Sequence, residues 1–150
     1  MENKKIKPRV RLVIIKNDKI LLSYVKSENY YFYMGGKMEW GETVKEACIR
    51  EVKEECDANF EFKKILYVRD YIKSEEDEHS IELYVLGDIN KMEEIEGLRD
   101  NEFGDDHWQT WVDLKNLGKI DVKPKGLVKQ ILKDYKSGFK QGAIYLGEID

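Results

Sequence analysis

The sequence is poor in the residues from which several classes of protein are built. With only two cysteines and two histidines, it offers neither a disulfide framework nor a zinc site of the usual composition. No apolar run approaches the roughly 20 residues that a membrane-spanning helix needs. The start of the chain, MENKKIKPRV, carries charge without the apolar segment of a signal peptide, which predicts a cytoplasmic protein.

The two cysteines, Cys48 and Cys56, stand in one predicted helix. At about 1.5 Å of rise per residue, their Cα atoms would lie roughly 12 Å apart, which is too far for a disulfide. No histidine stands nearby to complete a metal site or to activate a thiol. We therefore expect two small, buried, apolar side chains in a reducing compartment.

An excess of positive charge is also absent. The net charge is -4, and the charged residues, 37% of the chain, are interspersed in sign. This pattern argues against a general nucleic-acid binder, but a small anionic ligand needs only a local positive site. The length of 150 residues predicts one domain, over residues 1–150, that is large enough to bury a core.

The patterning predicts a mixed α/β domain with a mainly β core and helices on its faces. A hairpin is expected over residues 8–26, with its turn at Asn17-Asp18. Further strands are expected over 29–36, 60–73, 79–89 and 107–114, a loop over 91–106, and helices over 43–56 and from Pro124 to about Gly138.

The helix expected over 43–56 carries more carboxylates than a stable helix needs. Glu51, Glu54 and Glu55 fall near one face, where like charges repel. Thr43 and Glu46 have the spacing of a capping box, which sets the start of the helix. The stripe expected to face the sheet consists of Cys48, Ile49, Val52 and Cys56.

A divalent cation would relieve the repulsion among these partly buried acids. Magnesium takes oxygen ligands and keeps several waters, so a few carboxylates and one backbone carbonyl suffice. The paired glycines Gly35-Gly36 allow the backbone to approach an ion closely, and Glu39 and Glu42 add negative charge. The alternative explanation is an acidic helix face that is simply solvated.

The order Gly36, five residues, Glu42, seven residues and then the run from Arg50 to Glu55 resembles the signature box of the Nudix hydrolases. The family pattern is G-x5-E-x7-R-E-U-x-E-E-x-G-U, in which U is a bulky aliphatic residue. Asp57 stands where the family has the glycine that closes the helix, and Ala58 is a small occupant of the last position. Because Asp tolerates a left-handed conformation, we expect a modest loss of stability rather than of activity.

The resemblance implies an α/β/α sandwich, with a mixed β-sheet core and the box helix and the C-terminal helix on its faces. It also implies a pyrophosphohydrolase that cleaves a nucleoside diphosphate linked to another group, by attack of water on phosphorus, with Mg²⁺ or Mn²⁺ as cofactor. A Nudix-fold module that binds a nucleotide without cleaving it is the alternative. The complete set of box acids favours the enzyme.

Roles for the box residues follow from the same resemblance. It implies that Glu51, Glu54 and Glu55 are metal ligands or the general base, with the carbonyl of Gly36 as a further ligand. Either Glu51 or Glu54 could be the base, and the sequence does not choose between them. Arg50 is expected to orient Glu51 and to tie down the box loop.

Many family members recruit one more acid from a distant loop. We favour Glu102 for this role. The other candidates in the same acidic segment are Glu94, Glu96, Asp105 and Asp106. The tail at 141–150 is apolar enough to pack, and a subunit contact in a homodimer is one place for it.

Candidates for substrate contact lie outside the acidic helix. Arg9 and Arg11 share one face of the first strand and could either reach phosphate or form surface salt bridges. Tyr31 and Tyr33 share a face and could stack on a base or belong to the core. Trp40, in the box loop, is a candidate lid or stacking residue. The expected partner is a small nucleotide, with no membrane and no nucleic acid.

Overall fold

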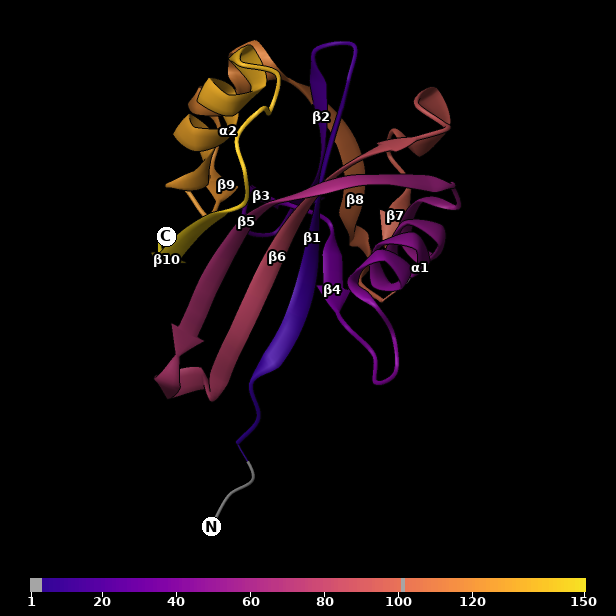
Figure 1. Ribbon diagram of the computed structural model, residues 1–150. Coiled ribbons are helices and arrows are strands. Elements are labelled where there is room, and N and C mark those ends of the chain that lie inside the picture. Colours follow the sequence, from indigo (N-terminus) through magenta and orange to yellow (C-terminus); the bar gives the residue numbers. More distant parts are fainter. Residues whose placement is uncertain (1–3, 101) are drawn as a thin grey trace.

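The computed structural model describes residues 4–100 and 102–150, which form a mixed sheet with two α-helices (Figure 1). The main path of the sheet has the order β10-β5-β6-β1-β2-β3-β9, while β4 pairs with β1, and β8 pairs with β2 and β7. The strands are β1 (Lys7–Lys16), β2 (Lys19–Val25), β3 (Tyr30–Phe32), β4 (Gly35–Lys37), β5 (Phe60–Lys73), β6 (Glu78–Ile89), β7 (Arg99–Asp100), β8 (Gly104–Asp113), β9 (Val122–Lys123) and β10 (Ile144–Glu148). The helices are α1 (Val44–Cys56) and α2 (Leu127–Lys136), with short 3-10 segments η1 (Ser74–Glu76), η2 (Glu93–Ile95) and η3 (Leu114–Lys119).

The strand β1 organises both halves of the sheet. Its first part pairs in parallel with β6 and antiparallel with β4, and its end pairs with β2. The turn into β2 is the predicted hairpin: Asn17 and Asp18 both have positive φ, at 52° and 59°, as a tight hairpin turn between right-twisted strands requires.

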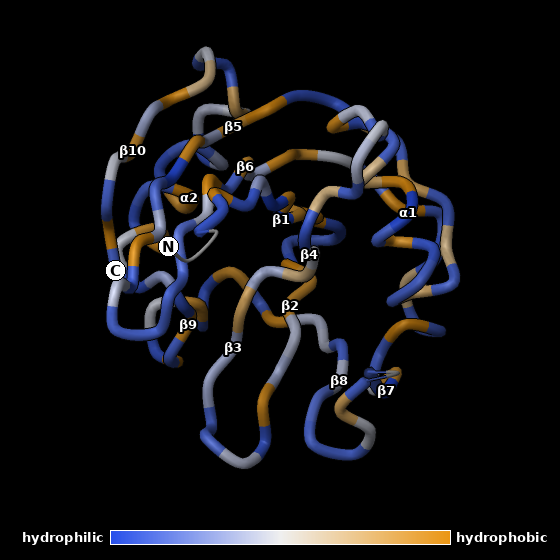
Figure 2. The backbone as a smooth tube through the Cα atoms, turned by 90° about the horizontal axis from the view of Figure 1, so that it is seen from below, coloured by the Kyte–Doolittle hydropathy of each residue, from blue (hydrophilic) through white to orange (hydrophobic). Residues whose placement is uncertain are grey.

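Side chains alternate along β1 and therefore supply two separate cores. Val10, Leu12 and Ile14 belong to the buried cluster beneath α1, whereas Val13 belongs to the cluster beneath α2. Figures 1 and 2 show α1 and α2 on opposite sides of β1. The predicted sandwich, with a mixed sheet between the box helix and the C-terminal helix, is confirmed.

Local sequence fixes both ends of α1. At its start, the Thr43 hydroxyl accepts the Glu46 N–H (3.1 Å), and the Glu46 carboxylate accepts the Thr43 N–H (3.2 Å), which completes the predicted capping box. At its end, Asp57 adopts the expected left-handed conformation, with φ 48° and ψ 46°. Both cysteines are free and buried, also as expected.

The prediction that Ile49 lies on the buried stripe of α1 is wrong. Its side chain is 41% exposed, and Ala47 is fully buried instead. The helix is thus rotated so that the Ala47 side, rather than the Ile49 side, faces the sheet. Because residues four apart share a helix face, the same rotation brings Glu51 inward.

Four other segments differ from expectation. The strand expected over 29–36 is divided into β3 and β4 by an irregular stretch at Tyr33 and Met34. The segment 91–106, expected to be a loop, holds η2, β7 and the start of β8. The last helix begins at Leu127 rather than at Pro124, and the tail forms β10, which packs on β5 of its own chain.

No helix in the described parts of the chain, 4–100 and 102–150, is long and apolar enough to cross a membrane.

The cap at Asp57 yields a stability prediction. Asp57→Gly should leave the melting temperature unchanged or raise it, because glycine has no Cβ penalty at positive φ and the lost ion pairs with Lys53 and Lys91 are exposed. Asp57→Val should lower it by roughly 3–8 °C, since a β-branched residue is strained there. Thermal unfolding followed by circular dichroism measures both, and a clear loss in the glycine variant would contradict the assignment.

Candidate active site

Arg50 lies at the centre of the acidic side of α1 and connects the helix to the loop before it. Its Nε donates to Glu42 Oε1 (2.6 Å), and its Nη2 donates to the carbonyl of Lys37 (3.0 Å). Its Nη1 donates to Glu51 Oε1 (3.1 Å) and to Glu54 Oε2 (3.2 Å). The hydrogen bonds to Glu42 are the main reason why the pKa of Arg50 is raised, and that of Glu42 lowered. The box loop and the helix are therefore tied together by one guanidinium group.

Glu51 is buried against the backbone of β4. The residue is 7% exposed, and a Cβ at position 36 would lie 2.8 Å from its Oε1. A side chain at position 36 would displace the Glu51 carboxylate from its place beside the strand. Burial raises the pKa of Glu51, while the charge of Arg50 acts against that rise.

The surroundings of Glu55 disfavour its negative charge. Its Oε2 is buried without a hydrogen-bond partner among the described residues. Burial, and then the charge of Glu51, raise the pKa of Glu55 to about 8, although Arg11 and the backbone of Gly35 act in the opposite direction. This side chain therefore stands where additional positive charge would be favourable.

The donor set fits a hard divalent cation. Glu51, Glu54 and Glu55, with the carbonyl of Gly36, offer the oxygen ligands that Mg²⁺ prefers. Within residues 4–100 and 102–150, no three acidic, histidine or cysteine side chains already converge as a complete metal site. Arg50 holds one oxygen each of Glu51 and Glu54. The orphaned oxygen of Glu55 is the feature that an incoming cation would satisfy.

Asp100 is a loop acid whose charge acts on Glu55, and the sequence analysis did not include it among the candidates. Its charge contributes to the raised pKa of Glu55, and its Oδ1 accepts the N–H groups of Glu102 (2.7 Å) and Phe103 (3.1 Å). Glu102 itself is exposed in the same turn. The pairing of β7 with β8 brings Asp100 into position, and so short a strand leaves no pattern in the sequence.

The other loop candidates have partners or positions of their own. Glu94 is exposed within η2, and Glu96 accepts the N–H of Trp111 (3.0 Å). Asp105 forms an ion pair with Arg99 (3.4 Å). Asp106 accepts hydrogen bonds from the backbone and the hydroxyl of Ser27 (2.9 and 2.8 Å).

A cleft of about 730 Å³ lies on the face of β1, β5 and β6 opposite to α1. Basic side chains line much of it: Arg9, Arg11, Arg69, Lys73, Lys123 and Lys125. Rings line it as well: Tyr30, Phe32, Tyr33, Tyr71, Phe103 and His107. Such a lining suits a ligand that combines negative charge with a flat ring.

Two of the cleft arginines share one buried carboxylate. Glu82, only 4% exposed, accepts Arg69 Nη1 (2.6 Å) through one oxygen and Arg11 Nε (3.0 Å) through the other. Burial alone would raise the pKa of Glu82, but the two arginines hold it below its usual range. Two guanidinium groups against one carboxylate leave this part of the cleft wall with an excess positive charge.

The structure brings together three of the five residues proposed for substrate contact. Arg9 and Arg11 line the cleft, as does Tyr33, which is buried. Both arginines also form ion pairs, Arg9 with a carboxylate of β6 at 3.1 Å, so the two interpretations of these residues coexist. Tyr31 packs on Tyr24, with ring centroids 4.7 Å apart, away from the cleft lining. Trp40 is fully exposed and also lies outside that lining.

A family model for the NUDIX domain matches residues 5–132. A solved UDP-X diphosphatase superposes with a TM-score of 0.70 at 18% identity, over 96% of this chain and 69% of that one. A MutT NUDIX hydrolase from Burkholderia pseudomallei gives 0.68 at 24% identity, over 84% and 97%. An ADP-ribose pyrophosphatase from Streptococcus suis gives 0.64 at 17% identity, over 93% and 98%. A search of curated proteins found no match.

The raised pKa of Glu55 predicts how stability depends on pH without metal. Its folded pKa is about 8, against an ordinary value of 4.5. The contribution of Glu55 to stability is therefore complete below about pH 4.5 and is lost as the pH rises through 8, because the buried group must then ionise. Between pH 5 and 9 in EDTA, the wild type should lose on the order of 3 kcal/mol more unfolding free energy than Glu55→Gln.

Urea denaturation across that pH range measures the difference. Glu54→Gln is the matched control, because its carboxylate is 55% exposed and should leave the slope unchanged. Parallel curves for the wild type and Glu55→Gln would show that Glu55 does not titrate in this window.

Proposed function

The chain belongs to the Nudix family of pyrophosphohydrolases, and we propose that it cleaves a nucleoside diphosphate linked to another group, with Mg²⁺ or Mn²⁺ as its cofactor. The observation that carries the proposal is the buried oxygen of Glu55, which has no hydrogen-bond partner among the described residues. It lies beside Glu51, on a helix face that Gly36 lets approach the sheet. Metal-assisted attack of water on phosphorus needs such a concentration of oxygen ligands.

The cleft supports the substrate class. Its volume of about 730 Å³ lies within the range of about 300–1,000 Å³ that small-molecule sites occupy. Arginine side chains bind phosphate through paired donors, and aromatic rings stack on bases. Arg11 connects the cleft with the acidic side of α1, because it lines the cleft and its charge acts on Glu55.

Each box residue has a role in this proposal. Glu51, Glu54 and Glu55 would hold the cation, with the carbonyl of Gly36. Once bound, the cation would shield phosphate charge and lower the pKa of water. Arg50 would position Glu51 and Glu54, since it donates to both, and its charge favours the ionised form of Glu51. Either of these two carboxylates would take the proton from the attacking water.

Three further elements complete the proposal. One hydrolase domain would span residues 1–150, because β10 beyond the family match joins the same sheet. Asp100 joins Glu102 as a candidate loop acid. A cytoplasmic location is consistent with two free cysteines.

Kinetics test the assignment of the acids. With Mg²⁺ and a panel of nucleoside diphosphate derivatives, Glu51→Gln and Glu54→Gln should each lose about a hundredfold to ten-thousandfold in kcat, because glutamine cannot accept a proton. Glu46→Gln is the control, since Glu46 contributes only to the capping box. Equal rates in all three variants would remove the box acids from catalysis, and no turnover by the wild type would favour the binding module.

Thermal unfolding tests the cation separately. Mg²⁺ should raise the melting temperature of the wild type at pH 8, because it binds the ionised form of Glu55 in the folded state only. Glu55→Gln should abolish most of that rise. A shift of the same size in the variant would exclude Glu55 from the metal site.

A further inference from the structure

One face of the sheet formed by β10, β5, β6 and β1 is covered by α1 over only part of its length. Pro8, Val10 and Leu12 of β1 alternate onto the face that α1 packs against. Val10 and Leu12 are completely buried, whereas Pro8 is exposed. The cover therefore ends between Val10 and Pro8.

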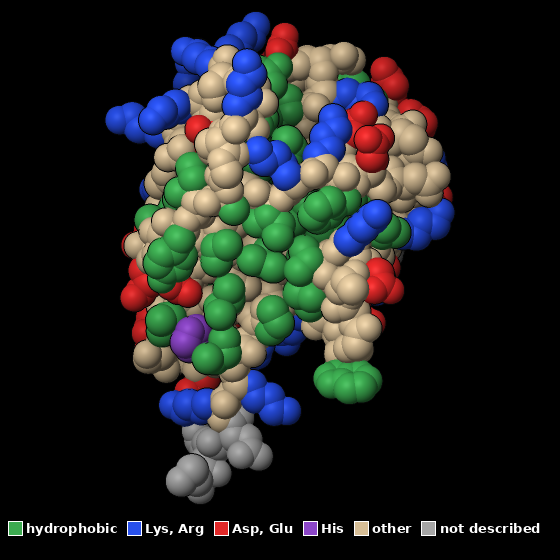
Figure 3. Space-filling view, viewed as in Figure 1, with side chains coloured by type: hydrophobic (Ala, Val, Ile, Leu, Met, Phe, Trp, Pro, Cys, Tyr) green, Lys and Arg blue, Asp and Glu red, His purple; other side chains and the backbone are tan. Residues whose placement is uncertain are grey.

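Apolar side chains continue across the strands beyond that boundary. The register aligns Pro8 of β1 with Ile81 of β6, and Ile72 of β5 with His79 of β6. Figure 3 shows apolar side chains gathered over the lower part of β5, β6 and β1. We call this surface the open apolar face, and it consists of Ile6, Pro8, Ile72, Ile81, Leu83 and Tyr145. Ile6, Ile72 and Tyr145 are 57%, 41% and 68% exposed.

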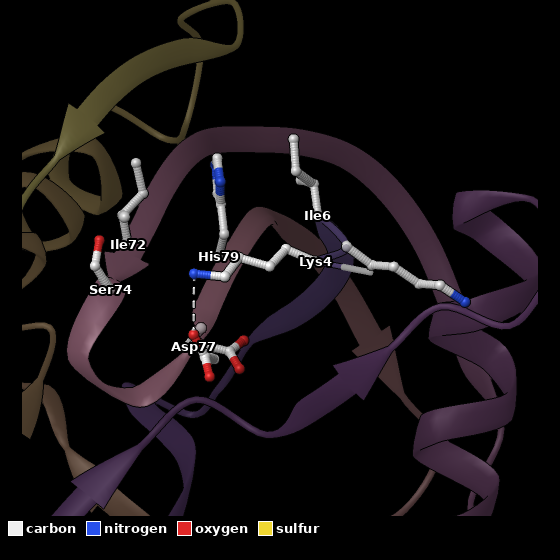
Figure 4. A pocket seen from close by; sticks show the side chains of 8 residues that line it. Lys4, Ile6, Ile72, Ser74, Asp77 and His79 are labelled. Carbon is white, nitrogen blue, oxygen red and sulfur yellow. Dashed lines mark ion pairs between the residues drawn. The ribbon is translucent and has the colours of Figure 1, made fainter. Parts of the chain in front are cut away.

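A pocket of about 160 Å³ lies at one end of the open apolar face. In Figure 4, the side chains of Ile6, His79 and Ile72 stand side by side and point the same way. The ion pair between Lys4 and Asp77 (3.3 Å) lies at its rim. The pocket thus has an apolar floor and a charged edge.

The loop between β4 and α1 begins beside the same face. The N–H of Met38 donates to the carbonyl of Pro8 (2.9 Å), and the Met38 side chain packs against the core beneath α1. Two residues later, Trp40 is 102% exposed, so its whole indole ring is in water. An exposed tryptophan beside an uncovered apolar face is typical of an association surface.

We propose that a second copy of this chain covers the open apolar face, with Trp40 of each copy seated in the pocket between Ile6 and Ile72 of the other. A two-fold symmetric contact requires that both complementary features lie on one surface, which this face provides. Charge is complementary at this contact, because the exposed Glu39 directly precedes Trp40 while Lys4 and Lys5 line the pocket.

The size of the face sets the strength of this dimer. Four strands about 4.8 Å apart, each contributing about five residues of about 3.3 Å, present on the order of 300 Å² per copy. The two faces and the two indole rings, which bury about 150–250 Å² each, together give about 1,000 Å², which lies in the range of weak, transient interfaces below about 1,200 Å². We therefore expect a reversible dimer with a Kd in the micromolar range.

Sedimentation velocity from 1 to 500 µM tests the proposal without reference to catalysis. The wild type should shift from monomer to dimer, and Trp40→Ala and Ile72→Lys should each weaken association by about tenfold or more. Ile49→Lys is the matched control, because Ile49 is also 41% exposed but lies on the outer side of α1, and it should associate as the wild type does. Circular dichroism checks folding.

A mixing experiment separates a direct contact from an indirect effect. Trp40→Ala keeps the pocket and Ile72→Lys keeps the indole, so their mixture can form a heterodimer with one intact Trp40 contact. That mixture should associate more strongly than either variant alone. A wild type that stays monomeric at 500 µM, an Ile72→Lys variant that dimerises normally, or a mixture no stronger than its components would overturn the proposal.

Discussion

The close approach of the Glu51 carboxylate to the backbone of Gly36 is the constraint on which the site depends. Three acids on one helix face would push α1 away from the sheet, since desolvation and repulsion both act against their ionised forms. Burial of the apolar side of α1 holds the helix in place, and Arg50 offsets part of the repulsion from the other side. Among the described residues, Glu55 keeps a buried oxygen without a hydrogen-bond partner, and there the donor set fits a cation.

The side chains of β1 point alternately to the two faces of the sheet, which connects the acids of α1 to the cleft. Val10 and Leu12 point toward α1, while Arg9 and Arg11 on the same strand point into the cleft. Positive charge from one face of the sheet therefore reaches the acids at its edge, as the effect of Arg11 on Glu55 shows. Under the proposed function, a phosphate group bound by Arg11 would lie near the acids proposed to hold the cation.

Features set by neighbouring residues could be predicted from the sequence. The capping box at Thr43, the left-handed cap at Asp57 and the tight turn at Asn17 each arise from local hydrogen bonds and steric limits. The exposure of Ile49 and the position of Asp100 could not be predicted, because both are decided by how distant segments pack. Neither a rotation of the helix about its axis nor a strand of two residues leaves a signal in the composition or the hydrophobic periodicity of the sequence.

Trp40 connects the surface of the molecule to the acids of the box. Its neighbour Glu39 lies 3.7 Å from Arg50, and Glu42 accepts two hydrogen bonds from the same guanidinium group. Any contact that holds the indole also restrains this loop, and with it the side chain that positions Glu51. When the tip of the loop lies in water, only the contacts at its base order it. When a partner also holds the tip, the loop loses less conformational entropy on binding a ligand. Association through the open apolar face would therefore favour an ordered Arg50 network.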